Sequence, residues 1–367
     1  MMDLEEPSTF DNGYYKSLSP QDKGRFGDEF KNNLGDFSSE SIVRELKTNF
    51  DKKSEHLNLL KAISACFHVR EGPATDTGFK FYGVNPLWGT TETEADAILI
   101  NSEHNCVYFL LVFCEIGAER QGEWVKNVNE AHRFFSQNHA KQVLKDKLTA
   151  NRRDIEIGYV TLTRDDDATD VDFAVLNKSC NASPYSVWGC DTDDRWIQYV
   201  DGSSLHPDLR SEFSSKVDYL ARKEPINFAV NTHPIFPLKA ILFNILLENQ
   251  TFGAEYLDEF NFGDFYDYFK SELKVFCDPD NEENVIRGEA KRVLQEAERS
   301  RIVTTQKSEL ESGEYKVVYS GTRGPEHARD AIKERYLKYM PEYVAGQRAF
   351  EKTKDEFART PGLGDFN

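Results

Sequence analysis

Residues 94–117 read EADAILINSEHNCVYFLLVFCEIG. The pattern predicts a short strand over residues 94–100, a polar turn over residues 101–105, and a long apolar strand over residues 106–116. Two apolar runs joined by about five turn-type residues are typical of a β-hairpin. A hairpin places the start of one strand beside the end of the other, so we expect Asp96 and Glu115 to lie close together.

This pair of carboxylates is the first candidate site in the chain. Mg²⁺ takes oxygen ligands and is usually held by one or two carboxylates together with substrate phosphates. The pair therefore predicts a site for Mg²⁺ or Mn²⁺ that acts on phosphodiesters, with Asp96 and Glu115 as the metal ligands. The alternative interpretation is that both carboxylates are solvated and only mark the ends of two strands.

The elements around the hairpin follow a recognisable order. The sequence predicts, in turn, a helix, the two strands of the hairpin, a long helix and a further strand, over residues 39–66, 94–100, 106–116, 123–148 and 154–163. This order resembles the core of the PD-(D/E)xK nuclease superfamily, which includes many restriction enzymes and repair nucleases, over about residues 40–200. The resemblance implies an α/β domain in which a mixed central sheet is flanked by helices.

The resemblance also implies roles for individual residues. It assigns metal binding to Asp96 and Glu115, and it places a catalytic lysine two residues after the glutamate, where this sequence has Gly117. Some members supply the lysine from the next helix, and Lys126 is the candidate here. A second register, using Glu119, fits less well because Gly117 and the charges after it indicate that the strand has ended.

Composition limits the class of protein. The chain has 367 residues, enough for two or three domains. Its longest apolar stretch, residues 106–114, is far shorter than the ~20 residues that span a bilayer, and its acidic start lacks the features of a signal peptide. We therefore expect a cytoplasmic protein without a membrane partner. The six cysteines include no C-x-x-C pair, so they are expected to be free thiols.

The net charge of −18 bears on nucleic-acid binding. Phosphate contacts supply most non-specific affinity for DNA, so this charge argues against a broad basic surface. A local basic face is still compatible with it.

Such a face is predicted in the second half of the chain. Residues 237–324 are expected to form helices, one of them ending near Phe260, followed by a hairpin of residues 302–306 and 314–319. This order resembles a winged helix-turn-helix domain, in which the helix before the wing enters the major groove. The resemblance implies contacts with bases or phosphates from Arg287, Lys291 and Arg292, and contacts with the DNA backbone from Lys307, Lys316 and Arg323.

The alternative for this region is a helical scaffold or dimerisation domain. Its basic residues would then pair at helical spacing with Glu289, Glu296 and Glu298.

The predicted organisation has five parts. They are an N-terminal arm with one short helix (1–38), a restriction-endonuclease-like α/β domain (39–224), a linker (225–236), a mainly α winged-helix-like domain (237–324), and a C-terminal helix to residue 340 with a tail (325–367). Further elements are expected as a strand over residues 171–176 and a helix over residues 208–220.

The sequence therefore predicts a DNA endonuclease that depends on Mg²⁺ or Mn²⁺, in restriction, phage defence or repair. A homodimer would suit double-strand cleavage. One alternative is a catalytically silent DNA-binding regulator or complex subunit, which Gly117 favours. Another is a protein-interaction scaffold, which the acidity favours.

Overall fold

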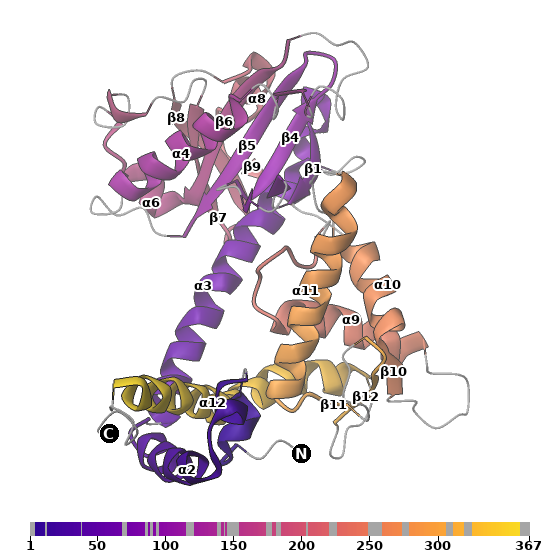
Figure 1. Ribbon diagram of the computed structural model, residues 1–367. Coiled ribbons are helices and arrows are strands. Elements are labelled where there is room, and N and C mark those ends of the chain that lie inside the picture. Colours follow the sequence, from indigo (N-terminus) through magenta and orange to yellow (C-terminus); the bar gives the residue numbers. More distant parts are fainter. Residues whose placement is uncertain are drawn as a thin grey trace. The chain divides into compact units, whose positions relative to one another are not determined.

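The protein is a mixed α/β chain whose largest element is a seven-stranded sheet (Figure 1). The computed structural model describes residues 4–11, 13–37, 39–67, 72–84, 87–88, 91–92, 95–114, 121–137, 141–142, 144, 154–173, 178–180, 185–202, 205–219, 226–248, 259–273, 279–305, 311–318 and 325–359. Over these ranges, no helix is both long enough and apolar enough to cross a membrane.

Contacts divide the chain into two compact units. Unit 1 comprises Met1–Asp51, Pro237–Tyr266 and Lys291–Asn367, and unit 2 comprises Lys52–Phe236 and Asp267–Ala290. The helices α3 (Ser39–Cys66), α10 (Phe262–Glu272) and α11 (Pro279–Arg299) have residues in both units.

The large sheet belongs to unit 2. Its order is β1-β4-β5-β6-β7-β8-β9, in which β5–β6 and β6–β7 are parallel and the other neighbours are antiparallel. The strands are β1 (Lys80–Val84), β4 (Ala97–Asn101), β5 (Cys106–Phe113), β6 (Glu156–Arg164), β7 (Tyr185–Asp191), β8 (Trp196–Gly202) and β9 (Val217–Asp218). A separate ribbon pairs β2 (Leu87–Trp88) with β3 (Thr91–Glu92).

The predicted hairpin is confirmed. Strands β4 and β5 pair antiparallel from Ala97↔Leu110 to Asn101↔Cys106. The predicted helix after β5 begins at Gln121 as α4 (Gln121–Phe135), and the chain then returns as β6, parallel to β5. Parallel neighbours require such a crossover connection, which is usually a helix.

Apolar clusters cover both faces of the sheet. On one face, Leu60 and Ile63 of α3 pack in a cluster with Tyr108 and Leu110 of β5. On the other face, Trp124, Val128 and Phe135 of α4 pack in a cluster with Phe109 and Leu111. Strand β5 is therefore buried on both sides, which accounts for its continuous apolar sequence.

Short helical elements complete unit 2. They are η2 (Pro73–Thr77), α6 (Asp165–Thr169) and α8 (Pro207–Glu212). The sequence pattern was wrong about α8, which ends at Glu212 instead of continuing to residue 220, because Val217 and Asp218 pair with Ile197 and Trp196 at the edge of the sheet. The strand expected over residues 171–176 is also wrong at Val171, Asp172 and Phe173, which belong to no strand, and residues 174–176 lie outside the described ranges.

Unit 1 is built around two helices. The predicted short helix is confirmed as α2 (Pro20–Leu34), and Phe26 and Phe30 pack against Ala349 and Phe350 of α12 (Pro325–Arg359). A buried hydrogen bond links the same helices, because Asn33 Nδ2 donates to Thr353 Oγ1 at 3.0 Å. The short elements η1 (Pro7–Phe10) and α1 (Tyr14–Ser17) precede α2.

Helix α12 is longer than the sequence suggests. It continues through Pro341 to Arg359, although the pattern predicts an end at Met340. A proline inside a helix removes one hydrogen bond and usually kinks or ends it. Tyr343, Ala349 and Phe350 lie beyond Pro341 and are buried, so packing offsets that loss.

The remaining elements form a helix–strand–helix–helix–strand–strand series. They are α9 (Ile235–Glu248), β10 (Glu259–Asn261), α10, α11, β11 (Val303–Thr305) and β12 (Glu314–Val317). The predicted hairpin of β11 and β12 is confirmed, and β12 lies between β10 and β11 in a three-stranded sheet. The helix expected to end near Phe260 is wrong at that end, because Phe260 pairs with Tyr315 as a strand residue.

A glycine in β6 yields a first prediction. A Cβ added at Gly158 would lie 2.3 Å from Cε1 of Tyr108, which is fully buried. We expect Gly158→Ala to lower the free energy of unfolding by about 1–3 kcal/mol, as overpacked cores do. The measurement is urea unfolding followed by circular dichroism. The matched control is Gly122→Ala in α4, where the added Cβ meets open space; equal stability of the two variants would contradict the prediction.

A histidine in α4 yields a pH prediction. Burial, with a smaller effect of the Lys141 charge, holds the pKa of His132 below its usual range. The unfolded chain therefore binds this proton more readily, so stability is full above about pH 6.5 and is lost as the pH falls towards the lowered native pKa. We expect His132→Gln to flatten the loss of unfolding free energy between about pH 7.5 and 5.5. The exposed His327→Gln should keep the wild-type slope.

Candidate functional site

The candidate site lies where the parallel strands β5 and β6 end. These strands are in register up to Phe113↔Thr163. In open α/β sheets, ligands bind outside the carboxyl ends of such strands. Strand β4 runs antiparallel to β5, so Asp96, just before β4, lies at this same end. We call this end of the sheet, marked by Asp96, Cys114 and Arg164, the Asp96 edge.

Both oxygens of the Asp96 carboxylate are engaged. Oδ2 accepts a hydrogen bond from the backbone N–H of Val112 at 2.6 Å, and Oδ1 lies 2.8 Å from Nε2 of His56 on α3. The backbone N–H of Asp96 donates to the carbonyl of Leu110 at 2.7 Å. The Asp96 and His56 side chains keep 19% and 25% of their exposure, so the carboxylate is oriented and still reachable from solvent.

Helix α3 brings further charged groups to this edge. Glu55, next to His56, forms an ion pair with Arg164 at the end of β6, with Oε1 and Nη1 3.3 Å apart. Lys52 precedes His56 by four residues, so the two share one face of the helix. The carbonyl of Lys52 lies 3.8 Å from the Cys114 Sγ. One face of α3 thus supplies a histidine, a glutamate and a lysine.

A cavity of about 200 Å³ lies at the end of β5. It is lined by the end of β5, by the start of α4 and by Lys52 of α3; the lining residues are Lys52, Val112, Phe113, Cys114, Glu123, Trp124 and Asn127. Val112 connects the cavity with Asp96, because its backbone N–H binds the carboxylate. The cavity therefore carries one cationic and one anionic side chain close to an oriented aspartate.

The predicted site residues have different outcomes. Asp96 lies directly before β4, and its expected closeness to Glu115 stays a prediction, because Glu115 and Gly117 fall outside the described residues. Lys126 is an exposed residue of α4 and does not line the cavity, whose α4 residues are Glu123, Trp124 and Asn127.

The structure adds three residues that the sequence did not single out. His56, Lys52 and Glu123 reach the site from helices, and the available signal was the spacing of Lys52 and His56 on one helix face.

The face of the sheet to which Asp96 points determines which residues of β5 could share a metal ion with it. The Asp96 carboxylate points to the α3 face, where it meets His56. On that face of β5, Val112 packs in the α3 cluster and Cys114 packs against it. At these two positions beside Asp96, the described strand therefore offers no second carboxylate.

The predicted DNA-binding residues are spread over α11 and β12. Lys291 forms an ion pair with Glu311, with Nζ and Oε1 2.5 Å apart, and Lys316 forms one with Glu259, with Nζ and Oε1 3.4 Å apart. Arg287 and Arg292 are half-buried, and Lys307 and Arg323 lie outside the described residues. Exposed ion pairs contribute only about 0.2–1 kcal/mol, so a phosphate can replace these glutamates at little cost.

The pairing expected for a scaffold occurs in part. Arg299 lies 3.0 Å from Glu296 on α11. Glu289, by contrast, accepts a hydrogen bond from the backbone N–H of Asn231 at 2.8 Å.

Comparison with protein-family models, with curated proteins and with solved structures found no match. The chemistry of the site therefore has to be inferred from its own geometry.

The contacts of Asp96 give a stability prediction. Asp96→Ala removes the acceptor of the Val112 N–H, and an unsatisfied buried donor costs about 1–3 kcal/mol. Asp96→Asn keeps an oxygen acceptor and should lie closer to the wild type in free energy of unfolding. The measurement is urea unfolding of the three proteins, and an alanine variant as stable as the asparagine variant would show that this hydrogen bond is not needed.

Proposed function

We propose that the protein is a DNA endonuclease that depends on Mg²⁺ or Mn²⁺ and cuts at the Asp96 edge. The observation that carries the proposal is the oriented Asp96 carboxylate, whose hydrogen-bond donor Val112 lines a cavity together with Lys52. The order α3–β4–β5–α4–β6 around it supports the proposal, since it is the order expected from the resemblance to PD-(D/E)xK nucleases.

The donor atoms fit a hard cation. A carboxylate has about four lone-pair positions, so Asp96 can bind a metal while it keeps the Val112 N–H. Asp96, with Glu115 or Glu123 as the second carboxylate, would hold the ion. A bound Mg²⁺ would polarise the scissile phosphate and lower the pKa of the attacking water.

The chain's own groups have separate tasks. Lys52, at the cavity wall, would offset the negative charge that develops on the phosphate, as fixed charges do in transition states. His56 would keep the carboxylate in place through its contact with Oδ1. Lys126, which is exposed on α4, stays a prediction for the same charge-offsetting task.

A second set of elements supports binding of DNA. The series α9–β10–α10–α11–β11–β12 fits the winged-helix order. Its three strands form one sheet, in which β12 lies between β10 and β11. In this proposal Arg287, Lys291 and Arg292 of α11 contact bases or phosphates, and Lys316 contacts the backbone from the wing.

The second candidate is a catalytically silent DNA-binding regulator on the same scaffold. It is favoured by Val112, near the end of β5, and Cys114, directly after β5, which lie beside Asp96 where a second carboxylate and a lysine would serve catalysis. It is also favoured by the contact of His56 with Asp96, which occupies the carboxylate in the absence of metal.

The test measures cleavage and binding together. Supercoiled plasmid and linear DNA are incubated with Mg²⁺ or Mn²⁺, and binding is scored in the same samples. We expect Asp96→Asn to lower the cleavage rate at least ~100-fold, the loss typical when one electrostatic stabiliser of a transition state is removed, while binding is unchanged. Asp218→Asn, at an exposed position of β9, is the matched control.

A lysine pair sharpens this test. Lys52→Gln should reduce cleavage strongly, whereas Lys126→Gln should do so only if Lys126 acts as the family resemblance implies. Binding without metal-dependent cutting would favour the silent regulator. No binding at moderate salt would refute both candidates.

A further inference from the structure

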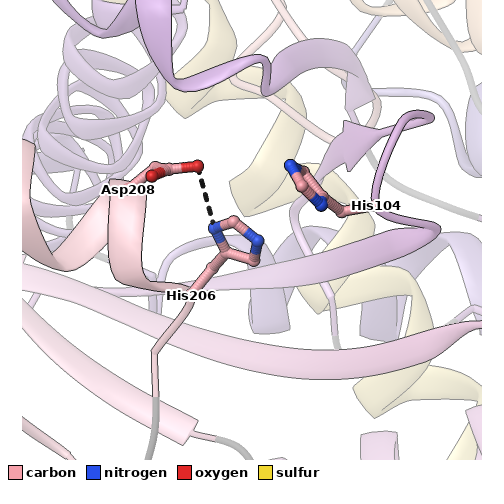
Figure 2. A group of neighbouring side chains, drawn as sticks. All are labelled: His104, His206 and Asp208. Carbon is pink, nitrogen blue, oxygen red and sulfur yellow. Dashed lines mark ion pairs between the residues drawn. The ribbon is translucent and has the colours of Figure 1, made fainter.

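A second cluster of ligand-type side chains lies at the other end of the β4–β5 hairpin. His104 belongs to the turn between β4 and β5, and His206 and Asp208 lie at the start of α8 (Figure 2). One ligand atom from each residue lies within 4.8 Å of the other two. We infer that these three residues form a zinc-binding site, separate from the Asp96 edge and independent of the proposed nuclease activity.

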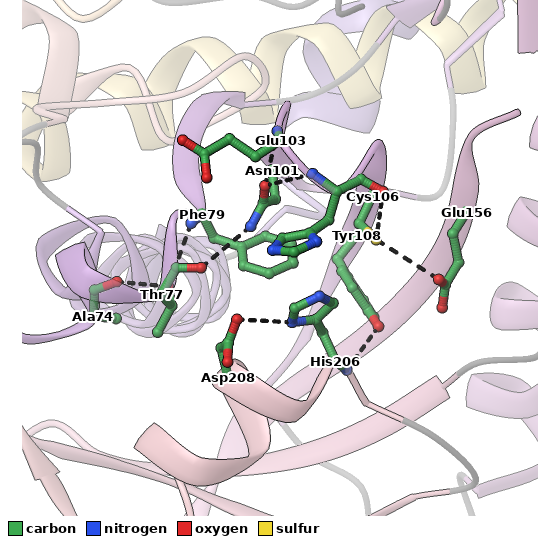
Figure 3. Close-up of polar contacts among 11 residues, drawn as sticks. Ala74, Thr77, Phe79, Asn101, Glu103, Cys106, Tyr108, Glu156, His206 and Asp208 are labelled. Carbon is green, nitrogen blue, oxygen red and sulfur yellow. Dashed lines mark hydrogen bonds and ion pairs between the residues drawn. The ribbon is translucent and has the colours of Figure 1, made fainter. Parts of the chain in front are cut away.

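The backbone around His104 is held in place. The Oδ1 atom of Asn101 accepts hydrogen bonds from the N–H groups of Glu103 and His104, at 3.0 and 3.1 Å. Asn101 is itself buried, and its Nδ2 donates to the carbonyl of Thr77 (Figure 3). The turn that carries His104 is therefore fixed by a buried side chain.

His206 is fixed as well. Its backbone N–H donates to the hydroxyl of Tyr108 at 3.0 Å, and its ring packs edge-on against Phe79, with centroids 5.3 Å apart (Figure 3). Tyr108 is fully buried in the α3 face of β5. The backbone and the ring of His206 are therefore both held in place by buried residues.

One ring nitrogen of His206 also lacks a hydrogen-bond partner in the described structure. This nitrogen, Nδ1, is buried. The nearest acidic oxygen, Oδ2 of Asp208, lies 3.5 Å away (Figure 2). The ring of His104 approaches that of His206 to a centroid distance of 4.8 Å at an angle of 49°. A cation bound among the three side chains would give the buried nitrogen a partner.

The donor set selects the metal. Two imidazole nitrogens and one carboxylate oxygen form a three-ligand set that Zn²⁺ accepts, with water in the fourth position, whereas Mg²⁺ and Ca²⁺ prefer oxygen ligands. With bonds of about 2.0–2.2 Å, tetrahedral ligand atoms lie roughly 3.4 Å apart. His104 and Asp208 are exposed and can rotate inward over the distance that remains.

The neighbouring thiol does not compete for the ion. The neighbouring thiol belongs to Cys106, which is buried at the start of β5. Its Sγ points to Glu156, 3.7 Å away, at the start of β6 (Figure 3). The Cys106 thiol is therefore engaged with Glu156, and the three clustered side chains offer nitrogen and oxygen ligands.

A metal bound at this site would cross-link two segments of unit 2. It would join the β4–β5 turn to the start of α8, about 100 residues later in the chain. A metal that binds only the folded chain stabilises it in proportion to the logarithm of the metal concentration over Kd.

The experiment uses the full chain after treatment with a chelator and gel filtration. Zn²⁺ is titrated against a chromophoric chelator, and thermal unfolding is followed with and without Zn²⁺. We expect one tightly bound Zn²⁺ per chain and a higher Tm. His104→Ala and Asp208→Asn, both at exposed positions, should weaken Zn²⁺ binding at least ~10–100-fold. Loss of a residue that only hydrogen-bonds to a metal ligand already has an effect of this size. Both variants should also lose the Zn²⁺-dependent rise in Tm.

Controls separate this site from others. The exposed His327→Ala should bind Zn²⁺ like the wild type, and His56→Ala should do so as well, because His56 belongs to the Asp96 edge. Co²⁺ in place of Zn²⁺ should give tetrahedral visible bands without a thiolate band. Wild-type chain that binds no Zn²⁺, or His104→Ala that binds it undiminished, would overturn the inference.

Discussion

Burial of β5 on both faces is the constraint on which the rest of unit 2 depends. The strand pairs with β4 on one side and β6 on the other, and apolar clusters with α3 and α4 cover its two faces. Such a strand excludes charged side chains along its length, since burying an unpaired charge is costly. Ionisable groups therefore collect at its two ends. Asp96, His56 and Lys52 lie at one end, and His104 and His206 lie at the other.

The sequence predicted those elements whose signal is local. The β4–β5 hairpin and α3 follow from apolar spacing and turn residues, and Asp96 lies directly before β4. The short strands β9 and β10 were missed because they exist only through partners far along the chain, and strand propensity depends on such context. His56 and Lys52 were missed for a related reason. Helical spacing shows that they share a face, but not which sheet edge that face meets.

The acidity of the chain and a DNA-binding role are compatible in physical terms. Lys291 of α11 and Lys316 of β12 have glutamate partners, in the ion pairs Lys291–Glu311 and Lys316–Glu259. These exposed pairs are weak, and they reduce the positive potential that would otherwise attract any polyanion. A phosphate held beside a lysine by a complementary surface could displace the glutamate. A phosphate that meets the lysine in a non-specific contact would gain little binding energy. The net charge of −18 would then lower non-specific affinity more than specific affinity.

A hairpin that is buried on both faces also needs contacts that fix its register, that is, which residues of β4 pair with which residues of β5. A slip of one residue would turn Asp96 from the α3 face to the α4 face. The apolar pattern cannot prevent this slip, because β4 and β5 are apolar on both faces. Polar contacts at the two ends can, since each fits one register only. Asn101 binds the turn at one end, and the Asp96 carboxylate binds the N–H of Val112 at the other. The contact that orients the candidate catalytic group therefore also selects the pairing that places it.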